Sequence, residues 1–311
     1  MSHVTADIIF RAVLSRPLSV GNARAVHDVF RSFQVNAQRV MGLIALRLPT
    51  GFHHWRCRQL GAALRQPYAA LIRQRFEAMA RGDAGLPDDM LASLIQAQNP
   101  VTGARFSESD VVDQAGTLFL AGHETSATTL AWALYLLACR PDLQDEVRRE
   151  VTALWGQREP GYGDTRCLAL THNVFWETLR LYPPIPFYLR QAAHSGCLRD
   201  KPVAQGDLVV VAPWVIQRHQ ALWERPDEFD PHRFATECGR ASAKPPFLPF
   251  GLGPRACLGV AFATQEALLV LGQLVRRYCF APVAGHVPQP SARLTLRSAN
   301  GMALRLTRLN P

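Results

Sequence analysis

The stretch FLPFGLGPRACLG, residues 247–259, leads directly into a run of apolar residues at helical spacing. Cys257 therefore lies at or just before a helix amino terminus, where exposed backbone N–H groups and the helix dipole stabilise negative charge on its sulfur. Gly251, Gly253 and Gly259 permit a tight turn and a close approach of the backbone to a bound group. A charge-stabilised sulfur in such a loop suits an iron ligand, whereas most free cysteines are buried structural residues.

A second unusual feature is a carboxylate in the middle of an apolar helix. Residues 111–139 are apolar nearly all round, which predicts a helix buried in the protein core. Glu124 lies near its centre, where a carboxylate without a partner carries a large desolvation cost. Ala121 and Gly122 precede it, and their small size would let a flat ligand lie against the helix. A kinked helix with a polar side chain bonded to a backbone carbonyl explains the same residues equally well.

Apolar spacing along the rest of the chain predicts a mainly helical protein with small β-sheets. Ser107 and Asp110 form a capping-box pattern that opens the long helix, and Asp88 is expected to cap a shorter helix through Gln96. The expected helices cover residues 4–15, 22–40, 60–80, 88–96, 107–139, 141–154, 168–181 and 258–278. The expected strands cover residues 208–212 and 303–309, and residues 226–249 are expected to form a loop.

The composition is that of a globular protein with a sizeable core. Of 311 residues, 48% are hydrophobic and 19% are charged, so disorder is not expected. The seven cysteines are scattered and include no C-x-x-C pair, which disfavours a disulfide framework or a zinc site and fits a reducing cytoplasm. No uncharged apolar run of about 18 residues is present, and the first residues lack a signal-peptide pattern, so no membrane segment is expected.

The formal net charge of +9 raises nucleic acid as a partner. Arginine supplies nearly all of the positive charge, since Lys201 and Lys244 are the only lysines. The arginines are dispersed along the chain and are not gathered on one helix with interleaved aromatic residues, so nucleic-acid binding is not expected. A basic face for an acidic electron donor is a better explanation, and an ordinary solvated surface is the default one.

Four short motifs resemble those of one known family. FGLGPRACLG (residues 250–259) resembles the cysteine-ligand loop of the cytochrome P450 family, and AGHETS (residues 121–126) is similar to its oxygen-activating helix motif. ETLR (residues 177–180) resembles its E-x-x-R helix, and PHRF (residues 231–234) resembles the loop whose arginine joins that pair. A lone E-x-x-R pair carries no information, because helices contain such pairs everywhere. Four motifs in the family's order, however, indicate membership of the family. The resemblance implies a single cytochrome P450-like domain over residues 1–311.

The resemblance also implies a cofactor, haem b (iron protoporphyrin IX), with Cys257 as the ligand of its iron. Phe250 would pack beside the sulfur, in the loop that Gly251 and Gly259 allow to turn. Arg255, two residues before the cysteine, would pair with a haem propionate. These residues together would form the cofactor-binding loop.

Two further groups of residues take roles by resemblance. Arg190, like Arg255, would pair with the haem propionates. Glu177, Arg180 and Arg233 would form a buried charge network that holds the region of the ligand loop, which is a structural role. Breaking one partner of such a network is expected to cost several kcal/mol.

On the oxygen-binding side, Ala121 and Gly122 would face the haem plane. Glu124 and Thr125 would be the catalytic residues, holding a hydrogen-bonded path that carries protons toward that side of the haem. The reaction implied is insertion of one oxygen atom of O2 into an apolar organic substrate. Electrons would come from a separate donor, either a ferredoxin-like or flavodoxin-like protein or a reductase, and the expected location is the cytoplasm.

The resemblance covers the carboxy-terminal two-thirds of the family fold, because the oxygen-activating helix begins near residue 107, and the amino-terminal third is expected to be absent. Trp214 and Arg218 match a W-x-x-x-R haem contact of that missing third by letters only, since they follow the E-x-x-R helix. Three interpretations stay open: a monooxygenase whose start was lost or is supplied by another chain, a non-catalytic remnant, and a haem-binding or sensor protein. Glu124 and Thr125 favour an enzyme origin, because neither residue is needed to hold haem.

Overall fold

The structure is a computed structural model that describes residues 1–18, 20–46, 48–236, 246–292 and 294–309. Part of the loop expected at residues 226–249, including Cys238 and Lys244, lies outside the described residues. The chain divides into two compact units, Met1–Ala127 and Thr128–Pro311, and each is considered by itself. The expectation of a single domain stays a prediction.

The first unit is helical wherever the structure describes it. Its helices are α1 (Ser2–Leu14), α2 (Val20–Ala45), α3 (Gly51–Arg81), α4 (Met90–Gln96) and the first part of α5 (Glu108–Ala138). The corresponding expected helices are confirmed, but α3 begins well before the expected residue 60. Phe52 and Trp55, the large apolar side chains of its first turns, are 69% and 53% exposed, so no buried apolar stripe marks the true start.

Helix α1 covers the middle of α5 within the first unit. Ile9, Phe10 and Val13 are buried, and the Phe10 ring meets that of Phe119 edge to face with the centroids 6.1 Å apart. The Thr5 hydroxyl donates a hydrogen bond of 2.8 Å to a carbonyl oxygen of α5. This packing buries the apolar side of α5 that the sequence predicts to be in the core.

The caps of α4 and α5 show how local chemistry starts these helices. Asp89 caps α4, since its carboxylate accepts a hydrogen bond from the Ala92 N–H at 2.9 Å. The expectation of Asp88 as the cap is therefore wrong by one residue. At α5, the Asp110 N–H donates to the Ser107 hydroxyl at 3.2 Å, and the Ser107 N–H donates to the Asp110 carboxylate at 3.0 Å. The expected capping box is confirmed.

A glycine of α5 makes room for a tyrosine of α3. A Cβ placed on Gly116 would lie 2.2 Å from the Tyr68 hydroxyl oxygen and 2.9 Å from its ring carbon Cζ. Burial raises the pKa of Tyr68 to about 12.

We expect Gly116→Ala to lower the free energy of unfolding by about 1–3 kcal/mol through overpacking, measured by urea denaturation. Gly61→Ala on α3, where nothing lies within 4 Å, is the control and should be neutral or stabilising; equal effects at both glycines would contradict the prediction.

The second unit contains the end of α5, four further helices and several 3-10 turns in its described part. These are α6 (Pro141–Trp155), η1 (Tyr162–Cys167), α7 (Ala169–Leu181), α8 (Pro213–Ile216), η2 (Pro231–Phe234), η3 (Gly253–Arg255) and α10 (Val260–Arg277). Helix α10 packs against α6 and α7. The helices expected at residues 141–154, 168–181 and 258–278 are confirmed. In the described part of either unit, no helix is both long and apolar enough to cross a membrane.

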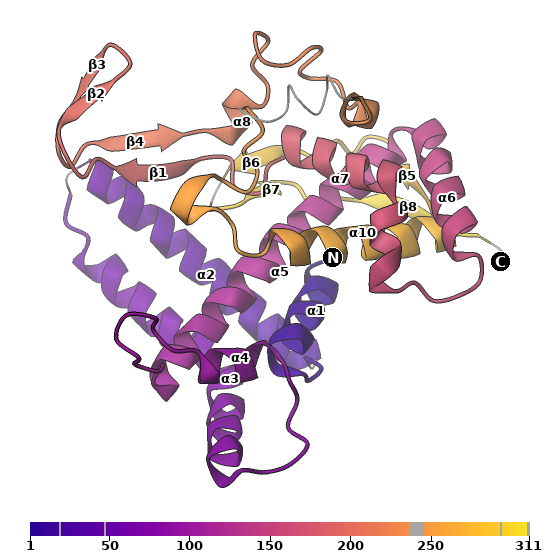
Figure 1. The fold of residues 1–311 in the computed structure, drawn as a ribbon. Helices are drawn as coiled ribbons and strands as arrows, with labels where there is room; N and C mark the ends of the chain where they lie inside the picture. The colour runs from indigo at the N-terminus through magenta and orange to yellow at the C-terminus, as the bar shows by residue number, and fades with distance from the viewer. Residues whose placement is uncertain (19, 47, 237–245, 293, 310–311) are drawn as a thin grey trace. The chain divides into compact units, whose positions relative to one another are not determined.

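The strands of the second unit pair into small antiparallel sheets. The pairs are β1 (Tyr188–Gln191) with β4 (Leu208–Val211), β2 (Gly196–Leu198) with β3 (Lys201–Val203), β5 (Tyr278–Pro282) with β8 (Leu304–Arg308), and β6 (Pro290–Ala292) with β7 (Leu296–Ser298). The strands expected near residues 208 and 303 are confirmed as β4 and β8. The others were missed because they are only three to five residues long, too short to show a clear alternating pattern, and β2 and β3 are also almost entirely exposed. A mainly helical fold with small sheets is confirmed (Figure 1).

Candidate functional site

The ligand loop turns on two glycines. Gly251 and Gly253 have φ angles of 67° and 72°, in the left-handed region that side chains with a Cβ rarely adopt. The Cys257 N–H donates a hydrogen bond of 2.8 Å to the Phe250 carbonyl oxygen, and the Ala256 N–H donates one of 3.0 Å to that of Gly253. The chain between residues 250 and 257 is thus closed into a compact loop that ends at the cysteine.

Cys257 presents its sulfur at the start of α10. Its side chain is exposed, and Gly259, which precedes the first residue of α10, lies so close that an added Cβ would be 3.8 Å from Sγ. Leu258 is 91% exposed, so this side of the loop is open in the second unit. The alternative of a buried structural cysteine is wrong. An accessible sulfur beside a helix amino terminus fits the iron ligand that the resemblance implies.

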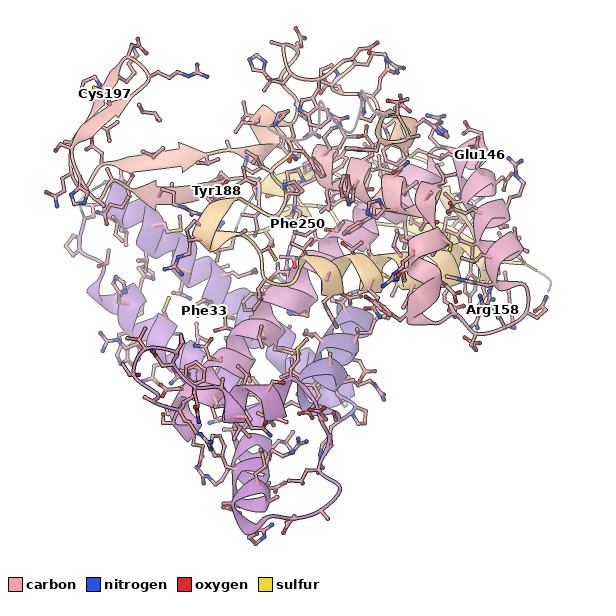
Figure 2. All side chains as sticks on the ribbon, viewed as in Figure 1. Phe33, Glu146, Arg158, Tyr188, Cys197 and Phe250 are labelled. Atoms are coloured by element: carbon pink, nitrogen blue, oxygen red, sulfur yellow. The ribbon has the colours of Figure 1, made fainter. Side chains whose placement is uncertain are left out.

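The other residues predicted for this side of a cofactor lie on the same unit. Phe250 is half-buried in the ligand loop, and Figure 2 shows it in the segment that leads to α10. Arg255 is exposed and forms no ion pair within the described residues. Arg190, on β1, is also exposed; its guanidinium lies 4.7 Å from the Tyr188 ring centroid and donates to the Leu189 carbonyl at 3.0 Å. Both arginines therefore have charge available for an anionic group.

Behind the loop lies a completely buried ion pair on α7. The Arg180 guanidinium donates two parallel hydrogen bonds to the Glu177 carboxylate, from Nε to Oε2 and from Nη2 to Oε1, each 2.8 Å long. Arg180 also donates to the carbonyl oxygens of Gln217 (2.8 Å), Pro226 (2.6 Å) and Glu228 (3.0 Å). Two parallel bonds and three carbonyl acceptors offset the large cost of removing both charges from water.

Arg233 of η2 joins the same carboxylate. Its Nε donates to Glu177 Oε1 at 3.0 Å, and its Nη1 donates to the Glu224 carbonyl at 2.8 Å. The Asp230 backbone N–H is a further donor to Glu177 Oε1, at 3.0 Å. The structure thus brings the three side chains of the predicted network together and ties the segment around η2 to α7.

An aromatic cluster connects this network to the first residue of the ligand stretch. Trp223 and Phe234 are buried, and Trp176 and Phe247 pack against them. The Phe247 ring centroid lies 5.2 Å from that of Trp176 and 5.4 Å from that of Phe234. The Arg180 guanidinium lies 5.3 Å from the Trp223 ring centroid, a cation–π contact. The cluster anchors the amino-terminal end of residues 247–259 to α7 and η2.

In the first unit, the acid of α5 is buried and hydrogen-bonded. Glu124 is 3% exposed, and its Oε2 accepts a hydrogen bond of 2.5 Å from the amide Nε2 of Gln34 on α2, itself 4% exposed. This amide offsets part of the desolvation cost of the carboxylate. Gln34 was not predicted as a site residue, because its only signal in the sequence is a polar residue on the buried side of an amphipathic helix.

The neighbouring Thr125 lies in a different environment. It is half-buried, and its hydroxyl donates to the Ala121 carbonyl at 2.6 Å, while Ala121 is exposed. A polar side chain bonded to a backbone carbonyl was the alternative explanation of residues 121–126, one that needs no bound ligand, and the Thr125 hydroxyl makes such a bond. A Cβ on Gly122 would lie 3.0 Å from side-chain atoms of Ile9, so packing of α1 already accounts for the glycine. Its contact with haem stays a prediction.

Trp214 and Arg218 contact each other. The Arg218 guanidinium lies 3.6 Å from the Trp214 ring centroid and 5.4 Å from that of Tyr182, and its side chain is 18% exposed. Loss of hydration on burial lowers the pKa of Arg218 to about 10. The W-x-x-x-R letters therefore describe an internal cation–π pair, in agreement with discounting them as a haem contact.

The fold and the loop define a class of protein: mainly helical, with an accessible cysteine at a helix start and a buried E-x-x-R pair behind it. The model of the cytochrome P450 family matches residues 1–304. The chain therefore belongs to the cytochrome P450 family, a membership that implies haem and monooxygenase chemistry.

Individual relatives agree with this membership. The chain is 36% identical over 226 residues to cyclooctatin synthase of Streptomyces melanosporofaciens, covering 73% of this chain and 49% of that protein. It is 30% identical over 231 residues to pentalenene oxygenase of Streptomyces avermitilis, covering 74% and 51%. The crystal structure of the cytochrome P450DA haem domain matches with a TM-score of 0.85 and 26% identity, over 100% of this chain and 67% of that one. The chain thus spans about half the length of these curated relatives.

Proposed function

We propose that the chain acts as a haem-thiolate monooxygenase that inserts one oxygen atom of O2 into an apolar organic substrate, with electrons from a separate donor. The observation that carries this proposal is the exposed Cys257 just before α10, in the unit that also holds the completely buried Glu177–Arg180 pair. Relatives named as an oxygenase and a synthase support it.

The second unit supplies the residues that would hold the cofactor. Cys257 would bind the iron through its thiolate, and Phe250 would pack beside the sulfur. Arg255 and Arg190 would pair with the two propionates, because both guanidinium groups are exposed. Haem b, when bound, would supply the activation of dioxygen and the oxidation of the substrate. The ligand loop orients the sulfur through the hydrogen bond between the Cys257 N–H and Phe250.

The first unit supplies the residues proposed to handle protons. Glu124 would hold a proton close to the surface of α5, and the Gln34 amide keeps its carboxylate in one orientation. Thr125, next in the chain, would pass that proton outward through its hydroxyl, which lies beside the exposed Ala121. Ala121 and Gly122 would lie against the cofactor.

The direct test is the spectrum of the purified chain with added haem, reduced and exposed to carbon monoxide. A thiolate-shifted Soret band is expected. Turnover is then tested with a ferredoxin and its reductase, a panel of apolar organic compounds that includes pentalenene, and isotopically labelled dioxygen, and one labelled oxygen atom per product is expected. Haem uptake without product would instead favour a haem-binding or sensor protein, and no haem uptake would favour a non-catalytic remnant.

Thr125→Ala is expected to keep haem and the thiolate spectrum but to uncouple electron use from product by about tenfold or more, because a proton donor near the reacting oxygen is lost. The measurement is hydrogen peroxide released per reducing equivalent consumed, with an apolar compound that the unsubstituted chain oxidises. Thr117→Ala is a matched control on the same helix, since its hydroxyl also bonds the carbonyl four residues earlier, that of Asp113, at 2.8 Å. Unchanged coupling in Thr125→Ala would remove Thr125 from the proton path.

A further inference from the structure

A buried glutamine joins the end of α7 to the ligand loop. Gln217 is 0% exposed. Its amide Nε2 donates to the carbonyl oxygens of Leu179 and Arg180, both at 3.0 Å, and its Oε1 accepts from the Leu248 N–H at 2.7 Å. Its backbone carbonyl also accepts from Arg180 Nη1 at 2.8 Å. Gln217 thus contacts the buried ion-pair network and the ligand loop at once.

Backbone hydrogen bonds connect Leu248 to Cys257 within the ligand loop. The Leu248 carbonyl accepts a hydrogen bond of 3.2 Å from the Gly251 N–H, which closes the first turn of the loop. The Phe250 carbonyl, inside that turn, accepts the Cys257 N–H at 2.8 Å. Two backbone hydrogen bonds therefore separate the amide contact at Leu248 from the residue that carries the sulfur.

The chemistry of an uncharged amide suits this position. The last carbonyls of a helix lack partners within the helix, and the loop offers a backbone N–H that also needs a partner away from water. A primary amide supplies two donors and an acceptor in one rigid plane. A leucine of similar size would leave all three backbone groups without this partner, and each such loss is costly in a buried site.

We infer that Gln217 is a positioning residue for the Cys257 sulfur, transmitting the fixed geometry of the Glu177–Arg180 pair to the ligand loop. The inference rests on the proposed function only in that the positioned sulfur is taken to bind haem. Its structural part, control of the loop by Gln217, holds with or without haem.

Gln144 provides a matched control. It is also a buried glutamine of the second unit, 1% exposed, whose Nε2 donates to the carbonyls of Leu137 (3.1 Å) and Phe280 (3.0 Å). Its Oε1 accepts from the Phe280 N–H at 2.9 Å and from Arg148 at 3.1 Å. These partners belong to α5, α6 and β5, not to the ligand loop. Gln144→Leu therefore removes comparable hydrogen bonds elsewhere in the same unit.

The experiment compares Gln217→Leu and Gln144→Leu in the full chain, purified with added haem. Amide hydrogen exchange of peptides covering residues 248–257 is expected to accelerate about tenfold or more in Gln217→Leu relative to Gln144→Leu. In the reduced, carbon monoxide-bound spectrum, only Gln217→Leu is expected to lose part of the thiolate-shifted band. If Gln217→Leu does not fold, Gln217→His keeps one donor and one acceptor, and a smaller acceleration, about threefold, is expected from it.

Equal exchange of the loop in the Gln217 and Gln144 variants would overturn the inference, whatever the spectrum. The spectrum of the unsubstituted chain tests the proposed function separately. If that chain takes up no haem, the proposed function fails, while the exchange comparison still decides the role of Gln217. If the unsubstituted chain shows the thiolate band and Gln217→Leu keeps both the band and the protection of its loop, the inference alone fails.

Discussion

Cys257→Ser is expected to abolish the thiolate-shifted Soret band of the reduced, carbon monoxide-bound chain while leaving the stability of the haem-free chain nearly unchanged. The sulfur is exposed, so serine removes no buried contact, and a surface substitution of this kind typically changes the free energy of unfolding by less than about 0.5 kcal/mol. A hydroxyl is a much harder and more weakly donating ligand than a thiolate, so the electronic contribution of sulfur to the iron is lost.

The measurement pairs that spectrum with urea denaturation of the haem-free chain, because loss of an iron ligand would itself lower the stability of the haem-bound form. Cys197→Ser is the control, because Cys197 is an exposed free cysteine on β2, and Figure 2 places it in the β2–β3 hairpin. The control should keep the thiolate band at full intensity. If the band survives in Cys257→Ser, Cys257 is not the ligand, and the assignment of the loop as the haem-binding segment fails with it.

Arg180→Met is expected to have the opposite signature, a large loss of stability. The substitution leaves the Glu177 carboxylate buried without its two parallel donors and removes the donor of three backbone carbonyls. Removing one partner of a buried ion pair typically costs about 3–5 kcal/mol, because the remaining charge stays out of water. Arg233 and the Asp230 N–H still contact the carboxylate, which keeps the expected cost within that range.

The free energy of unfolding from urea denaturation measures this effect. The matched control is Arg277→Met, since Arg277 also pairs with a glutamate, Glu159, at 3.2 Å, but with side chains 54% and 74% exposed. An exposed pair contributes at most about 1 kcal/mol, so this control should stay close to the unsubstituted chain. Equal losses in the two variants would show that the buried network does not hold the second unit together.

Cys257→Ser tests the proposed iron ligand, and Arg180→Met tests the buried ion pair that stabilises the fold around it. Cys257, the proposed iron ligand, is exposed, whereas Arg180 is completely buried and bonds the Glu177 carboxylate and backbone carbonyls. Glu124 and Thr125 show a similar contrast inside one helix. The acid is buried against Gln34, and its neighbour in the chain is half-exposed beside Ala121. Adjacent residues of a helix point in different directions, so a motif written in letters cannot show this difference.

The local sequence alone determined the features that depend on a few neighbouring residues. The turn at Gly251 and Gly253 follows from the positive φ angles that glycine tolerates, and the position of Cys257 follows from the helix that begins just after it. The capping box at Ser107 was readable for the same reason, since its partners are three residues apart. The family motifs consist of such short-range patterns, which explains why they indicated the mainly helical fold correctly.

Only the tertiary structure decided which distant residues support these motifs. Glu177 receives the Asp230 N–H, and Gln217 receives the Leu248 N–H, across segments whose sequences show no sign of the pairing. The contact between Glu177 and Arg233 was expected only from the family resemblance, not from any local pattern. The partners of the short strands were likewise set by the packing of the whole unit. The physical reason is that a buried polar group must be satisfied wherever the fold brings a partner, and that place depends on the packing of all the apolar faces together.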